Sequence, residues 1–243
     1  GKIYYVPVIN MSVDYVPNLL IQSQWLEKLD LQIPKTTDEF YDVLTAFKTQ
    51  DPNGNGEGDE IPLFFAEYAY FFRMSSMWGL DLTSSLGLKA NKNGELLCSF
   101  TSNEYKDFLE YWGKAYKEGL INSDFAGSNY DILYTHQSND AVGSSMIFIN
   151  FAERLSKLIN PELDIENDSL IMIPMEPLKG PYGDQSYIGN DPVAGVFGIS
   201  KDCKNPEAVF SFLDYLFSEE ANNLLYYGIE GEDYKIIDSK LLA

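Results

Sequence analysis

The stretch DPNGNGEGDE, residues 51–60, holds the side chains in this sequence that are best arranged to do chemistry. Oxygen-bearing side chains recur at alternate positions, and the glycines between them permit sharp turns. Calcium takes six to eight hard oxygen ligands, and alternate residues of an extended segment point the same way. The pattern therefore predicts a structural calcium site with the following ligands: Asp51, Asn53, Asn55, the carbonyl of Glu57, Asp59 and Glu60.

This loop departs from a standard EF-hand at its end. If Asp51 is counted as position 1, positions 1, 3, 5, 6 and 9 match, but position 12 is Pro62 instead of a bidentate glutamate. Glu60 is the available substitute and requires a shortened loop. A solvated turn is the alternative, since Asp-Pro and Asn-Gly are common in turns. A catalytic role is disfavoured because a general acid needs desolvation, whereas metal-bound carboxylates stay ionised.

Composition excludes several classes of function. Asp and Glu outnumber Lys and Arg by 37 to 17, and a net charge of −20 argues against nucleic acid and anionic membranes as partners. His136 is the only histidine, which excludes a Ser-His-Asp triad and His-ligated zinc within one chain. The two cysteines, Cys98 and Cys203, stand far apart and predict no disulfide framework. The chain has 17 Tyr, 15 Phe and 3 Trp, which is more than a core needs, so some of them are candidates for a stacking surface.

The segments around the loop have helical and strand patterns that would position it. The spacing of Ile21, Trp25 and Leu29 predicts a helix within residues 17–34. Thr36 and Glu39 have capping-box spacing, which predicts a second helix from there to Gln50, directly before the loop. The run IPLFF after the loop predicts a strand, and EYAYFFRMSSMWGL after that strand predicts an aromatic helix.

The rest of the chain continues the alternation of helices and strands. A capping box at Thr101 and Glu104 predicts a helix with a buried stripe, and Pro206 begins a later helix whose apolar face predicts a core. The stretches SSMIFIN, DSLIMIPM and VAGVFGIS predict strands. This order favours an α/β fold. The predicted stripe is Tyr105, Phe108, Leu109, Trp112 and Tyr116, and the later core face is Val209, Phe212, Leu213 and Leu216.

Two segments make the sequence similar to a known family. QWLEKLDLQIPKTTDEFYDVLTAFKTQDPNGNGEGDEIPL and GISKDCKNPEAVFSFLDYLFSEEANNLLYYGIEGEDY resemble the extracellular solute-binding lipoproteins of carbohydrate ABC importers in Gram-positive bacteria. Alginate- and maltose-binding receptors are related. In the alginate-binding receptors, a similar loop holds calcium through the equivalents of the six residues named above. Glu57 and Gly58 replace the usual lysine pair, but position 57 contributes only its carbonyl.

The resemblance implies a two-lobed, type II periplasmic-binding-protein-like architecture, present only in part. We expect residues 1–14 to be a first-lobe strand and hinge. Residues 15–170 would form most of the second lobe, including the calcium loop, and residues 171–243 the hinge and the segment that returns to the first lobe. A whole family member has further residues before and after these segments, so the chain is expected to be an internal piece.

The same resemblance implies where a sugar would bind. In this family, loops at strand ends contact the sugar and aromatic rings stack on its apolar faces. The segment after the predicted strand IPLFF matches one that supplies an acid and aromatics in the maltose-binding receptor. For Tyr70 and Trp78, packing in a core is an equally good alternative, because a helical aromatic stripe is usually buried. The candidate ligand residues are Glu67, Tyr68, Tyr70, Arg73, Trp78, Asn150 and Tyr187.

The function implied is that of a substrate-binding receptor for an oligosaccharide, and not of an enzyme. Its partners would be the sugar and a membrane permease, with no nucleic acid, and the receptor would be a monomer. It would be extracellular and lipid-anchored, with the anchor outside this chain. The alternatives are a fragment of a carbohydrate-active enzyme, for which no motif singles out a pair of carboxylates, and a calcium-stabilised adhesion module.

Overall fold

The computed structural model describes residues 5–9, 16–83, 87–90, 94–189, 193–237 and 240–242. The chain divides into two units, one of residues 12–190 and the other of residues 1–11 with 191–243. Within the described residues, no helix is both long and apolar enough to span a membrane. Assignment of the two units to receptor lobes stays a prediction.

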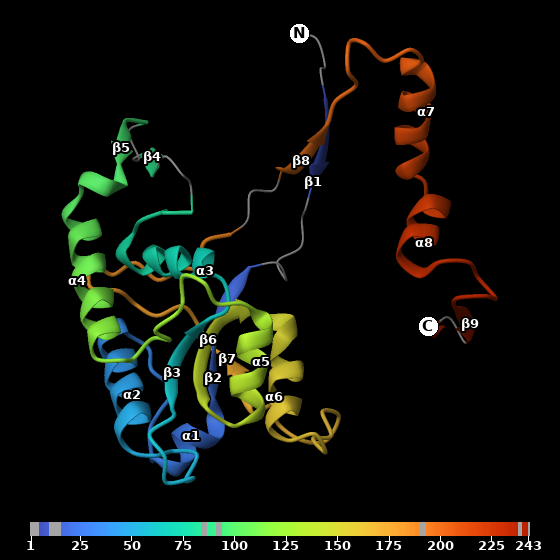
Figure 1. Cartoon of the computed structure of the whole chain (residues 1–243). Coiled ribbons are helices and arrows are strands. Elements are labelled where there is room, and N and C mark those ends of the chain that lie inside the picture. The colour runs from blue at the N-terminus through green and yellow to red at the C-terminus, as the bar shows by residue number, and fades with distance from the viewer. Residues whose placement is uncertain are drawn as a thin grey trace. The chain divides into compact units, whose positions relative to one another are not determined.

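A four-stranded mixed sheet forms the centre of the larger unit (Figure 1). Its order is β3 (Ile61–Phe65), β6 (Val142–Phe148), β2 (Pro17–Gln22) and β7 (Met172–Pro174). Strands β3 and β6 are parallel, whereas β2 runs antiparallel to both β6 and β7. Strands covered on both faces read as nearly continuous apolar runs, which explains sequences such as NLLI and PLFF.

Helices cover both faces of this sheet. Leu19 and Ile21 point into one core cluster and Leu20 into the other, as the two-residue period of a strand requires. Residues of α2 and α4 pack in the first cluster, and residues of α5 and α6 pack in the second (Figure 1). The helical elements are α1 (Ser23–Lys28), α2 (Thr37–Thr49), α3 (Tyr68–Arg73), η2 (Met74–Trp78), η3 (Ser99–Thr101), α4 (Asn103–Lys117), α5 (Tyr130–Ser138), η4 (Ile149–Phe151) and α6 (Ala152–Ile159). A hairpin of β4 (Leu88–Ala90) and β5 (Leu96–Cys98) precedes η3.

The prediction of one helix within residues 17–34 is wrong. Its first part is strand β2, and only α1 is helical. Ile21 pairs with Ser144 on one side and with Ile173 on the other. A short apolar run fits a buried strand as well as a helix, and here the two neighbouring strands decide the outcome.

The helix before the loop is confirmed. Thr36 Oγ1 accepts a hydrogen bond from the Glu39 backbone N–H at 3.1 Å, and Glu39 Oε2 accepts from the Thr36 N–H at 3.2 Å. This is the predicted capping box at the start of α2.

The predicted capping box of α4 is wrong by one position, because Ser102 caps the helix through the Tyr105 N–H at 3.1 Å. Phe108 and Trp112 are buried as predicted. Leu109 and Tyr116 are each 45% exposed, so the buried stripe is narrower than predicted.

The described residues of the smaller unit form two short sheets and two helices. β1 (Val6–Ile9) pairs antiparallel with β8 (Val193–Phe197), and β9 (Lys235–Ile237) pairs with β10 (Lys240–Leu242). The helices are α7 (Pro206–Leu216), with Pro206 at its first position, and α8 (Glu219–Tyr227). Leu213 is buried, whereas Val209 and Phe212 are exposed, contrary to the predicted core face.

Candidate functional site

The acidic loop joins the end of α2 to the start of β3 and is folded by its own side chains. Asp51 Oδ1 accepts from the Gly54 N–H at 2.9 Å, and Asp51 Oδ2 accepts from the Gly56 N–H at 3.1 Å. Both glycines have positive φ, 76° and 80°, which favours glycine at these turns. The amide groups of Asn53 and Asn55 both donate to Asp59 Oδ1, at 3.2 and 3.1 Å. Four of the six predicted ligand residues are thus tied to one another or to the loop backbone.

Glu60 is the fifth of these residues and has an unusual environment. The residue is 2% exposed, and its Oε1 atom is buried without a hydrogen-bond partner. Burial raises the pKa of this carboxyl; a hydrogen bond with its own backbone opposes the rise, and the nearby charges of Asp59 and Asp51 add to it. Its backbone carbonyl accepts from Lys48 Nζ at 2.8 Å. A buried carboxylate oxygen without a donor is uncommon, and a bound cation would satisfy it.

The donor set fits a hard cation. It consists of three carboxylates, two side-chain amides and one exposed residue, Glu57, that was predicted to contribute its carbonyl. Oxygen-only sets of this kind suit calcium more than zinc or copper. Across the described part of the chain, no three His, Cys, Asp or Glu side chains form a group that could hold a metal by themselves. Any site in this loop therefore depends on the amides and the carbonyl as well.

A second cluster of candidates lies where the two parallel strands end. Phe65 of β3 pairs with Met146 of β6, so the carboxyl ends of both strands reach the same edge of the sheet. Glu67 and Tyr68 follow β3 there, and Asn150 follows β6; all three are exposed. Ligands of α/β proteins commonly bind outside the carboxyl ends of strands.

Beside this edge is a cavity of about 620 Å³. Two of the predicted ligand residues, Tyr68 and Arg73, line it. Tyr68 is 53% exposed and packs edge to face with Phe72, with ring centroids 5.2 Å apart. Arg73 is half-buried and donates from Nη1 to the carbonyl of Ile188 at 2.9 Å. Aromatic faces beside a few polar groups are suited to a sugar ring. The lining residues are Tyr68, Ala69, Phe72, Arg73, Leu82, Thr83, Phe100 and Tyr105.

Tyr70 and Trp78 do not line this cavity, because both are buried. Trp78 is 2% exposed and packs edge to face against Tyr111 and Phe108, with centroids 5.0 and 5.3 Å apart. Tyr70 is 5% exposed, and its hydroxyl is hydrogen-bonded to that of Tyr130. Burial first, and then this hydrogen bond, raise the pKa of Tyr70. Both side chains are packed in the hydrophobic core, as the alternative interpretation of the sequence expects.

Tyr187 and Asn150 also lie apart from the cavity. The Tyr187 hydroxyl accepts from the Leu19 N–H at 3.2 Å and donates to the Met175 carbonyl at 3.0 Å, which gives it a structural role. Burial raises the pKa of Tyr187 to about 12. Asn150 lines a different recess of about 420 Å³ beside α6. The seven candidates are therefore not brought into one pocket within the described residues.

Sequence reasoning missed the aromatic pair Phe100 and Tyr105 as lining residues. Their ring centroids are 5.3 Å apart, and Phe100 is 41% exposed. Tyr105 had been assigned to the buried stripe of α4. The sequence does place Phe100 just before the residues that cap α4, and therefore outside the periodic apolar stripe of that helix. This position could have marked Phe100 as a surface residue.

The sequence profile of the family described as bacterial extracellular solute-binding protein matches residues 6–223. The chain belongs to this family. It is 32% identical over 232 residues to lipoprotein LipO of Bacillus subtilis (strain 168), which covers 90% of this chain and 44% of LipO. It is 27% identical over 223 residues to the polygalacturonan/rhamnogalacturonan-binding protein YtcQ of the same strain, which covers 89% of this chain and 43% of YtcQ. The chain thus spans less than half the length of these two relatives.

Solved structures show the same fold. The alginate-binding protein AlgQ2 without calcium ion superposes on this chain with a TM-score of 0.79 at 24% identity. The superposition covers all of this chain and 49% of AlgQ2. An EF-hand mutant of the S. pneumoniae binding protein FusA, in complex with fructo-nystose, superposes with a TM-score of 0.73 at 21% identity and covers 99% of this chain and 50% of FusA. The predicted architecture, a partial two-lobed periplasmic-binding-protein-like fold of the α/β class, is confirmed.

Proposed function

We propose that the complete protein is the extracellular receptor of an ABC importer and that it binds an oligosaccharide. The observation that carries this proposal is the cavity beside the carboxyl end of β3, where the exposed ring of Tyr68 and the guanidinium of Arg73 lie together. Family membership supports it, as do relatives that are named for binding polygalacturonan and rhamnogalacturonan or for transporting fructooligosaccharides. A membrane permease is the corresponding partner, and the receptor is a monomeric, lipid-anchored protein at the cell surface.

A screen of oligosaccharides by thermal shift tests this proposal, because a ligand that binds only the native state raises the melting temperature. The sugar that gives a shift is then titrated by calorimetry into wild type and into Tyr68→Ala. We expect the substitution to weaken binding by about tenfold, which is what losing roughly 1.4 kcal/mol of stacking would cause. Tyr116→Ala removes another exposed tyrosine of the same unit, outside the cavity, and should bind normally.

Two experimental outcomes would refute this proposal. If Tyr68→Ala and Tyr116→Ala bind the sugar equally well, the cavity is not the binding site. If the pure protein releases cleaved sugar in excess of its own molar amount, the protein is a carbohydrate-active enzyme instead.

The loop of residues 51–60 is proposed to hold a structural calcium ion in this receptor. Its support is the unpartnered buried oxygen of Glu60 together with the convergence of Asn53 and Asn55 on Asp59. One solved neighbour is described as lacking its calcium ion and another as an EF-hand mutant. The ion would join the end of α2 to the start of β3. Chelation should lower the melting temperature and calcium should restore it, whereas Asp51→Ala should abolish both effects. A variant that still responds to calcium like wild type would refute the site.

A further inference from the structure

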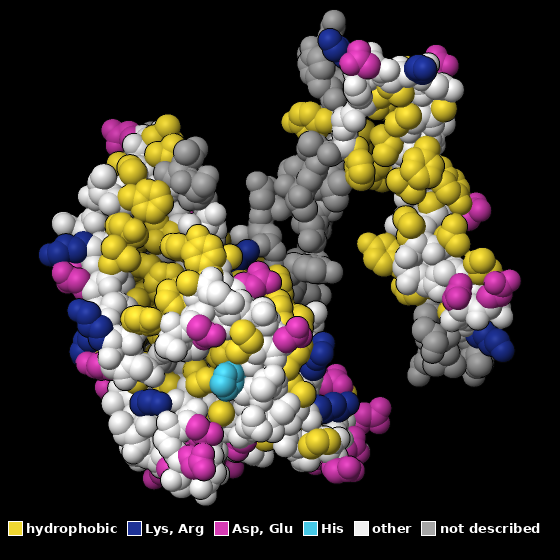
Figure 2. Space-filling view, viewed as in Figure 1, with side chains coloured by type: hydrophobic (Ala, Val, Ile, Leu, Met, Phe, Trp, Pro, Cys, Tyr) yellow, Lys and Arg dark blue, Asp and Glu magenta, His cyan; other side chains and the backbone are white. Residues whose placement is uncertain are grey.

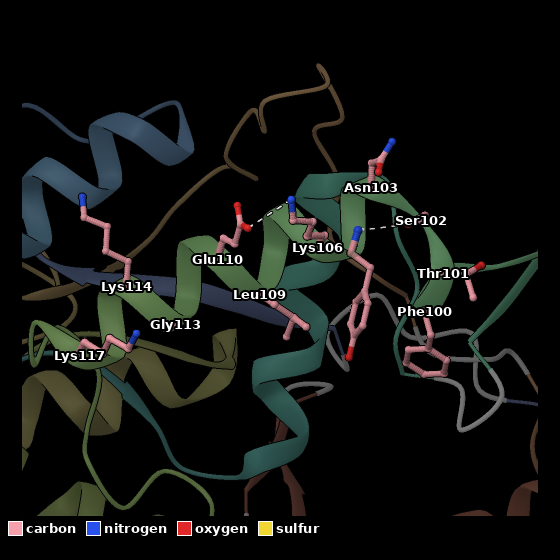
Figure 3. A pocket seen from close by; sticks show the side chains of 11 residues that line it. Phe100, Thr101, Ser102, Asn103, Lys106, Leu109, Glu110, Gly113, Lys114 and Lys117 are labelled. Atoms are coloured by element: carbon pink, nitrogen blue, oxygen red, sulfur yellow. Dashed lines mark hydrogen bonds and ion pairs between the residues drawn. The ribbon is translucent and has the colours of Figure 1, made fainter.

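A second hollow adjoins the candidate sugar cavity and has no role so far. It runs along the outer face of α4, has a volume of about 720 Å³ and is lined by residues from Phe100 to Lys117 (Figure 3). Phe100 and Tyr105 line both hollows. The two hollows are therefore neighbours that share this aromatic pair within the larger unit.

The walls of the α4 groove differ in chemistry. Leu109 and Phe100 point to one side of the helix, and the Lys106–Glu110 ion pair and Lys114 lie on the other (Figure 3). Leu109 is 45% exposed and Phe100 is 41% exposed, although both are large apolar side chains. Figure 2 shows hydrophobic side chains gathered over α3 and α4. A contiguous exposed apolar patch with a polar rim is typical of an interaction site.

The floor of the groove contains a glycine in the interior of a helix. Gly113 lies four residues before the end of α4, and glycine is less favourable there than any other common residue except proline. A Cβ atom at this position would meet no other atom within 4 Å, so packing does not require glycine. Its backbone is helical, so left-handed strain does not require it either. What the glycine does provide is an unobstructed groove between Leu109 and Lys117.

We propose that the α4 groove is an extension subsite that binds the distal residues of a linear oligosaccharide whose first residues occupy the Tyr68 cavity. This inference rests on the proposed sugar-receptor function. Phe100 and Tyr105 form the stacking platform where the chain passes from one hollow to the other. Asn103, Lys106 and Glu110 on the polar rim are able to hydrogen-bond sugar hydroxyls. Both hollows have volumes in the range that small-molecule sites occupy.

Calorimetric titration with two length series tests the subsite in the complete protein. The probes are oligogalacturonides and inulin-type fructo-oligosaccharides, each from dimer to hexamer. In wild type, we expect the affinity for one series to rise by about tenfold with length. Gly113→Gln should place a side chain across the groove and cancel this rise, while the dimer binds as in wild type. Because glutamine favours helices more than glycine does, this variant should melt no lower than wild type.

Gly127→Gln is the matched control, since Gly127 is exposed, has a normal backbone conformation and lies outside both hollows. It should show the wild-type length dependence.

A length dependence that survives in Gly113→Gln, or an affinity that is equal for all lengths, would overturn the subsite but leave the receptor function standing. If no member of either series binds, both proposals fail for these sugars. If wild type sediments as a dimer and Gly113→Gln as a monomer, the groove is a contact between copies and the subsite is refuted.

Discussion

Glu60 brings a carboxylate into the core at the edge of the acidic loop. Without a cation, its ionised form is costly because one oxygen is buried and unpartnered. Calcium would reverse this effect by supplying the missing partner. The same side chain should therefore oppose folding in the absence of calcium and favour folding in its presence.

Replacement of Glu60 by glutamine separates these two effects. Glu60→Gln should melt slightly higher than wild type in a chelator, because a buried neutral amide costs less than a buried carboxylate. It should also lose most of the rise in melting temperature that calcium produces. Glu57→Gln is the control, because Glu57 is exposed and is proposed to act only through its carbonyl. If Glu60→Gln keeps the full calcium response, Glu60 is not a ligand.

Tyr187 gives a prediction for alkaline pH. Its pKa is raised to about 12 in the folded protein, against the ordinary value of 10.0. Between these two values, the unfolded chain has lost this proton and the native protein has kept it. Stability must therefore fall as pH rises through this range, by up to about 2.7 kcal/mol from this residue.

The measurement is the free energy of unfolding in urea between pH 9 and 11.5. Tyr187→Phe should be less stable than wild type at pH 9, since it loses the hydrogen bonds to Leu19 and Met175. It should also lose less stability as the pH rises. Equal slopes in the two proteins would show that Tyr187 titrates normally.

At the scale of elements, the short segment formed by α3 and η2 contains both exposed and buried aromatic residues. Tyr68 at its start is exposed in the cavity, whereas Trp78 at its end is packed among the aromatic rings of α4. The two residues are only ten positions apart, yet substitution of each should affect a different property.

Trp78→Ala should cost about 3–5 kcal/mol of stability, as truncation of a buried aromatic usually does. Tyr68→Ala should change stability by roughly 0.5 kcal/mol or less, as is usual for exposed positions. Urea unfolding of both variants checks this contrast. A Trp78→Ala protein as stable as wild type would mean that this ring lies outside the core.

The elements also show what the sequence can and cannot predict. Helix α2 was predictable because its cap, its periodicity and the following loop agree. Strand β2 was not, because three successive apolar residues fit either a helix or a strand, and the choice depends on β6 and β7. The calcium loop could be proposed from the sequence because its candidate ligands are local in sequence. The candidate sugar cavity could not, because exposure of Tyr68 and burial of Trp78 depend on α4, which lies far along the chain.

At the scale of the whole molecule, the larger unit contains its own core. Both hydrophobic clusters consist only of residues between Leu19 and Tyr187, all within that unit. None of the residues described in the smaller unit belongs to either cluster. The larger unit therefore meets the main physical requirement for folding alone.

A protein consisting of residues 12–190 should fold by itself. We expect a helical circular-dichroism spectrum, a single cooperative urea transition and the calcium response of the complete protein. A protein of residues 12–120, which lacks β6, is the control and should remain unfolded because the sheet loses its second strand. A gradual, non-cooperative transition in the longer piece would show that its core needs the rest of the chain.

The pairing of β2 with β6 has a consequence for the order of folding. More than a hundred residues separate Leu19 from its partner Met146. Contacts of such long range close large loops and slow the search for the native state. During synthesis, β2 emerges before β6, and the sheet cannot form until β6 has also left the ribosome. The residues between β2 and β6 therefore remain without their central sheet until β6 has been synthesised, so this part of the larger unit stays unfolded on the ribosome longer than its own length alone would require.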